Sequence, residues 1–306
     1  MPPKPVPTQR QKRLGHELRR MRVAAGMSAE DAAKLLGVDR GKISYMESGV
    51  RNISEERLRT LAHHCGCTDE RYVNALAEMA SAGSQGWWEQ YRGALPNAML
   101  DIAELEARTT RMRASCTVHI PGLLQTTDYA LAVFRAVLPR LPEHEIAMRA
   151  AYRSRRQEVL TAHTAPHFTG IVHEAALRMQ FGGTRVAREQ LDHLLARSEE
   201  DGVAVLVVPF AHGSFPGAGQ TVLYAEGATQ QLDTVQIDNA HGPDFLYGEA
   251  ELSKYRAHLE RMEELALSPD DSRDFIRAIA HGMEEASCPR SNGKSRSAGK
   301  GTRASG

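Results

Sequence analysis

The chain of 306 residues lacks long apolar runs: none approaches the roughly 20 residues that cross a bilayer. Its first residues, Met-Pro-Pro-Lys-Pro-Val-Pro, hold no apolar core, so we expect no secretory signal. Cysteine is scarce, with four scattered residues, and the pair Cys65-x-Cys67 has no second pair to complete a zinc site. We therefore expect reduced thiols, no bound metal and a cytoplasmic location.

Net charge is also absent, because 38 Lys and Arg balance 38 Asp and Glu, but the charges are unevenly distributed. Residues 1–64 hold 13 basic and 7 acidic residues, and residues 289–306 hold 5 basic residues and no acidic one. The stretch between them carries 20 basic and 31 acidic residues. Phosphate attraction requires positive charge, so nucleic acid is expected to meet the amino-terminal part, and the acidic remainder to serve another purpose.

Two short helices separated by a tight turn are predicted within this basic part. Ser28 can cap the first helix, and Gly37 can end it in the left-handed conformation. Asp39 caps the second helix, whose inward positions are Ile43 and Met46. A helix-turn-helix of this kind places its second helix in the DNA major groove, which indicates binding to duplex DNA.

The start of the second helix is expected to meet the base edges. Arg40 is the candidate base reader, because an Arg there can donate two hydrogen bonds to a guanine; simple neutralisation of a phosphate is the alternative. Lys42 is expected to contact a phosphate. The complete set of candidate DNA-binding residues is Ser28, Arg40, Gly41, Lys42, Ser44, Tyr45 and Arg51.

Several members of this set have more than one role open to them. Ser28 could donate its hydroxyl or amide to a phosphate. Gly41 could permit a close approach of the backbone or be merely tolerated in the first turn. Tyr45 could touch a thymine methyl group or a phosphate, or only pack, and Arg51 could contact the backbone or remain solvated.

Arg22 and Glu47 are assigned to the scaffold. The first helix of the chain and the recognition helix must be held at a fixed angle. An Arg on one and a carboxylate at the end of the other could do so through two parallel hydrogen bonds.

The predicted fold class is α+β: a five-helix all-α domain followed by an α+β domain with a small sheet of about four strands. We expect a disordered tail at 1–10, the helix-turn-helix domain at 11–80, a linker at 81–86, the second domain at 87–285 and a disordered basic tail at 286–306.

Periodicity places the elements of the second domain. Trp87, Trp88 and Tyr91 are expected to begin its core. Arg149, Arg153 and Arg156 share a helix face, where they could hold an acidic or phosphorylated ligand or pair with the domain's own acids. Helices are predicted at about 98–113, 127–138, 143–162, 174–180, 184–198, 249–267 and 269–281, and strands at 167–172, 203–208, 220–225 and 232–237, the last two as a hairpin or as paired edge strands.

Residues 14–65 resemble the Cro/C1-type (XRE) helix-turn-helix family. The similarity lies in the first helix, in Leu35-Leu36-Gly37-Val38, in Ile43-Ser44, in Glu47-Ser48-Gly49 and in residues 58–62. Such domains often begin their second helix with Thr-Gln, whose glutamine binds a phosphate. This chain has Ser28-Ala29 there, so that contact is lost or replaced.

Residues 87–281 resemble a domain that follows this motif in actinobacterial regulators, including WhiJ-like proteins. The matching motifs are Trp87-Trp88, residues 120–129, Arg153-x-x-Arg156-Gln157, residues 174–178, Gln190-Leu191 and Val207-Val208-Pro209-Phe210. The resemblance implies a DNA-binding regulator, often encoded beside a small partner protein and sometimes described as antitoxin-like, and it assigns no catalytic residue.

We therefore expect a homodimeric transcriptional regulator, a repressor or autoregulator, whose second domain binds a small partner protein or ligand. The alternative is an antitoxin-like protein that chiefly sequesters a small partner encoded nearby. We expect no enzyme activity and no cofactor. His173-Glu174 lacks the second histidine of a zinc protease, because Leu177 stands in its place, and Gly213-Ser214 is not part of a serine-hydrolase elbow.

Overall fold

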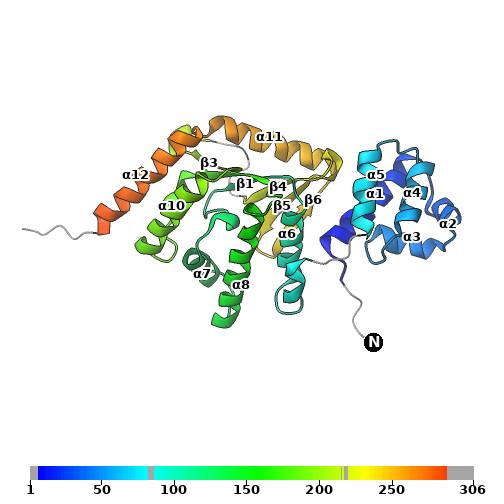
Figure 1. Cartoon of the computed structure of the whole chain (residues 1–306), viewed down its shortest axis with the longest axis horizontal. Helices are drawn as coiled ribbons and strands as arrows, with labels where there is room; N and C mark the ends of the chain where they lie inside the picture. The colour runs from blue at the N-terminus through cyan, green and yellow to red at the C-terminus, as the bar shows by residue number, and fades with distance from the viewer. Residues whose placement is uncertain (1–5, 82–85, 215, 217–219, 288–306) are drawn as a thin grey trace, which may run out of the picture.

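The protein is described by a computed structural model that covers residues 6–81, 86–214, 216 and 220–287, with the side chains of 284–287 left undescribed. Two bodies lie side by side: a helical amino-terminal domain and a carboxy-terminal domain built on a sheet (Figure 1). None of the described helices is long and apolar enough to cross a membrane.

The amino-terminal domain contains the five expected helices, α1 (Gln9–Ala24), α2 (Ala29–Leu36), α3 (Arg40–Glu47), α4 (Glu55–His64) and α5 (Glu70–Ser81). Each of the first four starts at a side-chain cap, from Thr8, Ser28, Asp39 and Ser54 respectively. Gly37 ends α2 in the left-handed conformation, as its position predicts. The apolar faces of all five helices meet in one core.

Helix α1 begins earlier than expected. Residues 1–5 lie outside the described residues, but the tail expected to be disordered as far as residue 10 overlaps α1 by two residues. Thr8 and Gln11 form a reciprocal capping box there, since each side chain accepts the other's backbone amide. The expected tail at 286–306 overlaps helix α12 to Ser287, and its remainder lies outside the described residues.

The carboxy-terminal domain alternates helices and strands. Its helices are α6 (Asn97–Ala107), α7 (Thr127–Arg135), α8 (Glu143–Arg156), α9 (Glu174–Arg178), α10 (Thr184–Ser198), α11 (Glu249–Leu265) and α12 (Pro269–Ser287). Its strands are β1 (Arg111–Cys116), β2 (His167–His173), β3 (Val203–Val208), β4 (Val222–Glu226), β5 (Thr234–Asn239) and β6 (Gly242–Leu246). Short 3-10 turns join them, among them η1 (Trp87–Tyr91) and η5 (Gln230–Leu232).

The six strands form one mixed sheet in the order β3-β2-β1-β4-β5-β6. Strands β1, β2 and β3 are parallel, and β4, β5 and β6 continue the sheet antiparallel from β1. The α+β class and the β4–β5 hairpin are confirmed, but the expected number of about four strands is wrong. The helix predicted at 98–113 ends at Ala107 in the structure, and its last three residues belong to β1, which the prediction lacks. The edge strand β6 begins Gly-Pro-Asp, a poor strand pattern.

Helices cover both faces of this sheet (Figure 1). On one face α11 contributes Leu252, Leu259 and Met262 to a core with Tyr224 and Val235. The other face carries the larger core, in which Met112, Phe168 and Leu223 meet side chains of α7, α9, α10 and α12. Because alternate strand residues enter opposite cores, both sides of the sheet are buried.

The tryptophans and the arginine row lie at the edge of this domain. Trp88 and Tyr152 centre a separate apolar cluster, flanked by Trp87 and Tyr91, as expected. Of the three arginines, two pair with the domain's own acids as one of the two expectations had it, and the third bonds an amide side chain. Arg149 pairs with Glu145 at 2.6 Å, Arg156 pairs with buried Glu106 at 2.5 Å, and Arg153 donates to the Gln125 side chain at 2.8 Å.

Helix α1 joins the two domains through its first two turns. The backbone amide of Gln9 donates to the carboxylate of Asp101 at 3.1 Å, and Arg10 pairs with Glu104 at 2.7 Å. Arg13, whose residue surface is only 5% exposed, donates to the backbone carbonyls of Gln231 at 2.5 Å and of Tyr247 at 3.3 Å. The amino-terminal domain is therefore docked largely through α1, and Asp69, just before α5, accepts a further hydrogen bond from the Gln231 side chain at 3.1 Å.

Burial at this junction raises the pKa of Asp101 to about 6; the Gln9 amide opposes the shift and Glu104 adds to it. An unfolded aspartate titrates near pH ~3.9, so between these values the folded state binds more protons and stability falls as pH rises. Asp101→Asn keeps an acceptor for the Gln9 amide. We therefore expect the variant's Tm, relative to that of the parent, to rise between about pH 4 and 6.5 and then level off.

Thermal unfolding across that pH range measures the difference between the two proteins. A constant difference between their Tm values at all pH values would contradict this account of Asp101.

Candidate nucleic-acid interface

Helix α3 presents one face to the core and the other to solvent. The Asp39 side chain caps it by accepting from the Lys42 amide at 2.8 Å, and Ile43 and Met46 are buried beneath it. The opposite face exposes Arg40, Gly41, Ser44 and Tyr45, as a recognition helix requires, and half of the Tyr45 surface is open to solvent. The residues expected to read DNA thus share one exposed face.

The basic groups on this surface differ in their own partners. Arg40 and Arg51 are exposed, and neither pairs with a carboxylate in the part of the chain that the structure describes. Lys42 instead lies 3.0 Å from the carboxylate of Asp39, and the hydrogen bonds and charge of Lys42 lower the pKa of Asp39. A phosphate at Lys42 must compete with Asp39, whereas Arg40 is available without breaking an ion pair.

Ser28 is engaged at the start of α2. Its hydroxyl donates to the Asp31 carboxylate at 2.5 Å and accepts the Asp31 amide at 3.1 Å, and its own amide also donates to that carboxylate. These contacts form a capping box and lower the pKa of Asp31. The phosphate contact of Ser28 stays a prediction, and it requires the serine to leave Asp31.

The predicted clamp between Arg22 and Glu47 is confirmed. Nε of Arg22 donates to Oε1 of Glu47 at 2.5 Å, and Nη2 donates to Oε2 at 3.0 Å. Nη1 of the same arginine donates to the carbonyl of Met27 at 2.7 Å, just before α2. One side chain of α1 thus fixes the end of α3 and the approach to α2, and the contact with Glu47 raises the pKa of Arg22.

Gly15 is a second determinant of α3, and the sequence pattern did not identify it. A Cβ atom at this position of α1 would lie 2.5 Å from the carbonyl oxygen of Glu47 and 2.6 Å from that of Met46. The helix α1 and the end of α3 are therefore in backbone contact. Gly49 closes the same junction from the other side, since its φ is +75° and a Cβ there would meet the backbone of Gln11 at 2.7 Å.

This arrangement is that of a helix-turn-helix DNA-binding regulator, and the comparison with protein families agrees. Residues 13–72 match the family described as "Helix-turn-helix domain". Residues 99–278, more than half of the chain, match the "Domain of unknown function (DUF5753)", and the chain belongs to that family. Searches of curated proteins and of solved structures give no match.

Because of the close contact at Gly15, we expect Gly15→Ala to lower stability, although this substitution normally stabilises a helix. Ala is normally favoured over Gly inside a helix by about 0.5–1 kcal/mol. At Gly15 the added methyl meets two backbone carbonyls that have little freedom to retreat, so Gly15→Ala should destabilise the amino-terminal domain by about 1–3 kcal/mol.

The matched control is Gly282→Ala in α12, where a Cβ meets nothing within 4 Å. It should follow the ordinary rule and stabilise the chain. Urea unfolding followed by circular dichroism measures both variants. Equal stabilisation by the two substitutions would show that α1 and α3 are not in contact at Gly15.

Proposed function

We propose that this regulator binds a specific duplex sequence and that Arg40 reads a guanine in it. The observation that carries the proposal is the state of Arg40: it is exposed in the first turn of a helix clamped at its other end, and it pairs with no described carboxylate. A guanidinium presented in this way can donate two hydrogen bonds to O6 and N7 of a guanine. Gly41, Ser44 and Tyr45 complete the base-facing surface, with Ser28, Lys42 and Arg51 on the phosphates.

The regulator is proposed to act as a homodimer on an inverted repeat in the cytoplasm. One recognition helix contacts too few bases for useful specificity, and two-fold symmetry sets half-sites about 34 Å apart. Binding at the chain's own promoter would make it a repressor and autoregulator. The protein is proposed to work by binding alone, without catalysis or a cofactor.

The carboxy-terminal domain is proposed to bind a small partner protein or a ligand. The net negative charge of residues 65–288 favours a partner with basic or amphipathic surfaces. In the antitoxin-like alternative the partner, expressed alone, harms the cell, and DNA binding serves autoregulation.

The test of the proposal is Arg40→Ala in a selection of bound sequences from random duplexes. The variant should lose about 1–3 kcal/mol of affinity for the selected site and its preference at one base pair. Arg261→Ala in α11, which removes another exposed positive charge, one that pairs with Glu264 in the other domain, is the control and should leave the site unchanged. An unaltered preference in the Arg40 variant would refute the assignment of α3.

Lys42→Ala should act differently, because a phosphate contact carries no sequence information. It should weaken binding to every duplex alike and reduce the dependence of log K on log salt by about 0.9 for the one phosphate lost. Fluorescence anisotropy with one selected and one random duplex, between 50 and 200 mM salt, gives this slope. A slope equal to that of the parent protein would remove Lys42 from the interface.

A further inference from the structure

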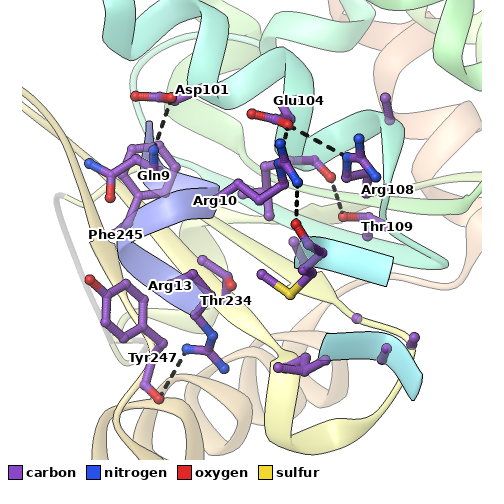
Figure 2. A pocket seen from close by; sticks show the side chains of 18 of the residues that line it. Gln9, Arg10, Arg13, Asp101, Glu104, Arg108, Thr109, Thr234, Phe245 and Tyr247 are labelled. Atoms are coloured by element: carbon purple, nitrogen blue, oxygen red, sulfur yellow. Dashed lines mark hydrogen bonds and ion pairs between the residues drawn. The ribbon is translucent and has the colours of Figure 1, made fainter. Parts of the chain in front are cut away.

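A cavity of about 420 Å³ lies between the two domains, beside the first turns of α1 (Figure 2). The amino-terminal domain supplies Arg10, Arg13 and Met79 to its walls, and the carboxy-terminal domain supplies Trp88, Asp101 and Phe245. Small-molecule sites usually enclose roughly 300–1,000 Å³, are mostly apolar with a few polar groups, and often lie between domains. The cavity has this size, place and lining.

The positive groups of the cavity already have protein partners. Arg10 pairs with Glu104 and donates to the carbonyl of Met79. Arg13 pairs with Glu17 at 3.2 Å in addition to its contacts across the domain boundary. Glu104 also forms an ion pair with a second arginine, Arg108, at 3.6 Å (Figure 2). An anionic ligand would therefore find each of these cations occupied.

Two acidic groups that line the cavity have no ion-pair partner within the described residues: Glu78, which is exposed, and Asp101, which is half-buried. Asp101 accepts one hydrogen bond, from the backbone amide of Gln9. Lys12 and Arg92 are close enough to favour its charged form but do not pair with it. One oxygen of this half-buried carboxylate is thus left for a positively charged partner, beside the apolar surfaces of Trp88 and Phe245.

The cavity is also linked to α3 through a single helix. Arg10 and Arg13 in the first turns of α1 line the cavity, and Gly15 and Arg22 further along the same helix hold α3. Because its walls come from both domains, the cavity exists only while the domains are docked. A ligand that fills it must therefore stabilise the docked arrangement.

We propose that this cavity binds a small amphipathic amine, with an apolar body against Trp88 and Phe245 and its ammonium group on Asp101, and that binding holds the two domains together. The regulatory meaning of this site rests on the proposed function: the ligand would change DNA affinity by favouring one placement of α1 and α3. The binding site itself does not depend on DNA.

The first experiment compares three probes that share a phenylbutyl body on the full chain: 4-phenylbutylamine, 4-phenylbutanol and 4-phenylbutyrate. In isothermal titration at pH 7.5 the amine should bind at least tenfold more tightly than the alcohol or the carboxylate and should raise the Tm. Asp101→Asn should remove this tenfold preference while the alcohol binds as before. Asp192→Asn on α10, an exposed aspartate far from the cavity lining, is the matched control and should behave as the parent.

Two results would overturn the site: no binding of the amine at millimolar concentration, or equal affinity of the parent and the Asp101 variant for it. The melting curve of each variant confirms that it is folded.

The second experiment measures affinity for the selected duplex with and without saturating amine. At least a threefold change in the parent, absent in Asp101→Asn, is expected, and reciprocity requires the duplex to change amine affinity by the same factor. An unchanged DNA affinity with the cavity saturated would overturn the coupling. A chain that binds the amine through Asp101 but prefers no duplex would refute the proposed function and leave the site standing.

Discussion

The backbone contact between α1 and α3 is the constraint on which the arrangement of the reading surface depends. At Gly15 the two helices approach without an intervening side chain, and at the next turns the Arg22–Glu47 pair fixes their relative rotation. Both contacts hold the carboxy-terminal end of α3 at Glu47, and the buried side chains of Ile43 and Met46 pack the rest of that helix into the core. The exposed residues of α3 inherit their direction from α1, so anything that displaces α1 redirects them.

The middle of α1 is held by buried charged groups. Glu17 is fully buried and is shared by Arg13, Arg20 and the hydroxyl of Tyr72, at 3.2, 2.8 and 2.6 Å. Burial lowers the pKa of Arg13 and raises that of Tyr72. Charged groups removed from water need partners, and Arg13 finds its last two in carbonyls of the carboxy-terminal domain. Docking of the domains thus supplies the polar partners that Arg13 needs while it is removed from water.

Local chemistry made much of the fold predictable. Side-chain caps at Ser28, Asp39 and Ser54 and the left-handed Gly37 mark helix ends directly, and the Arg22–Glu47 clamp follows from two opposite charges at helix ends. Strand β1 could not be predicted, because its sequence is Arg-Met-Arg-Ala-Ser-Cys and its buried Arg113 looks like a surface residue. The guanidinium of Arg113 lies 5.0 Å from the centre of the Tyr224 ring, which is more than one hundred residues away in the sequence, so no local pattern indicates the contact. The role of Gly15 and the cavity could not be predicted for the same reason, since both depend on segments that are far apart in the sequence and meet only in the folded protein.

The positions of the Arg13 partners in the sequence have a consequence for how the protein folds during its synthesis. The carbonyl of Tyr247 belongs to a residue about 165 positions beyond the end of α5, and at synthesis rates of roughly 5–20 residues per second it follows about 10–30 s later. Throughout that interval the residues of all five amino-terminal helices have been synthesised, but the carbonyl of Tyr247 that accepts from Arg13 has not. The contacts that dock the two domains can therefore form only late in the synthesis of each molecule.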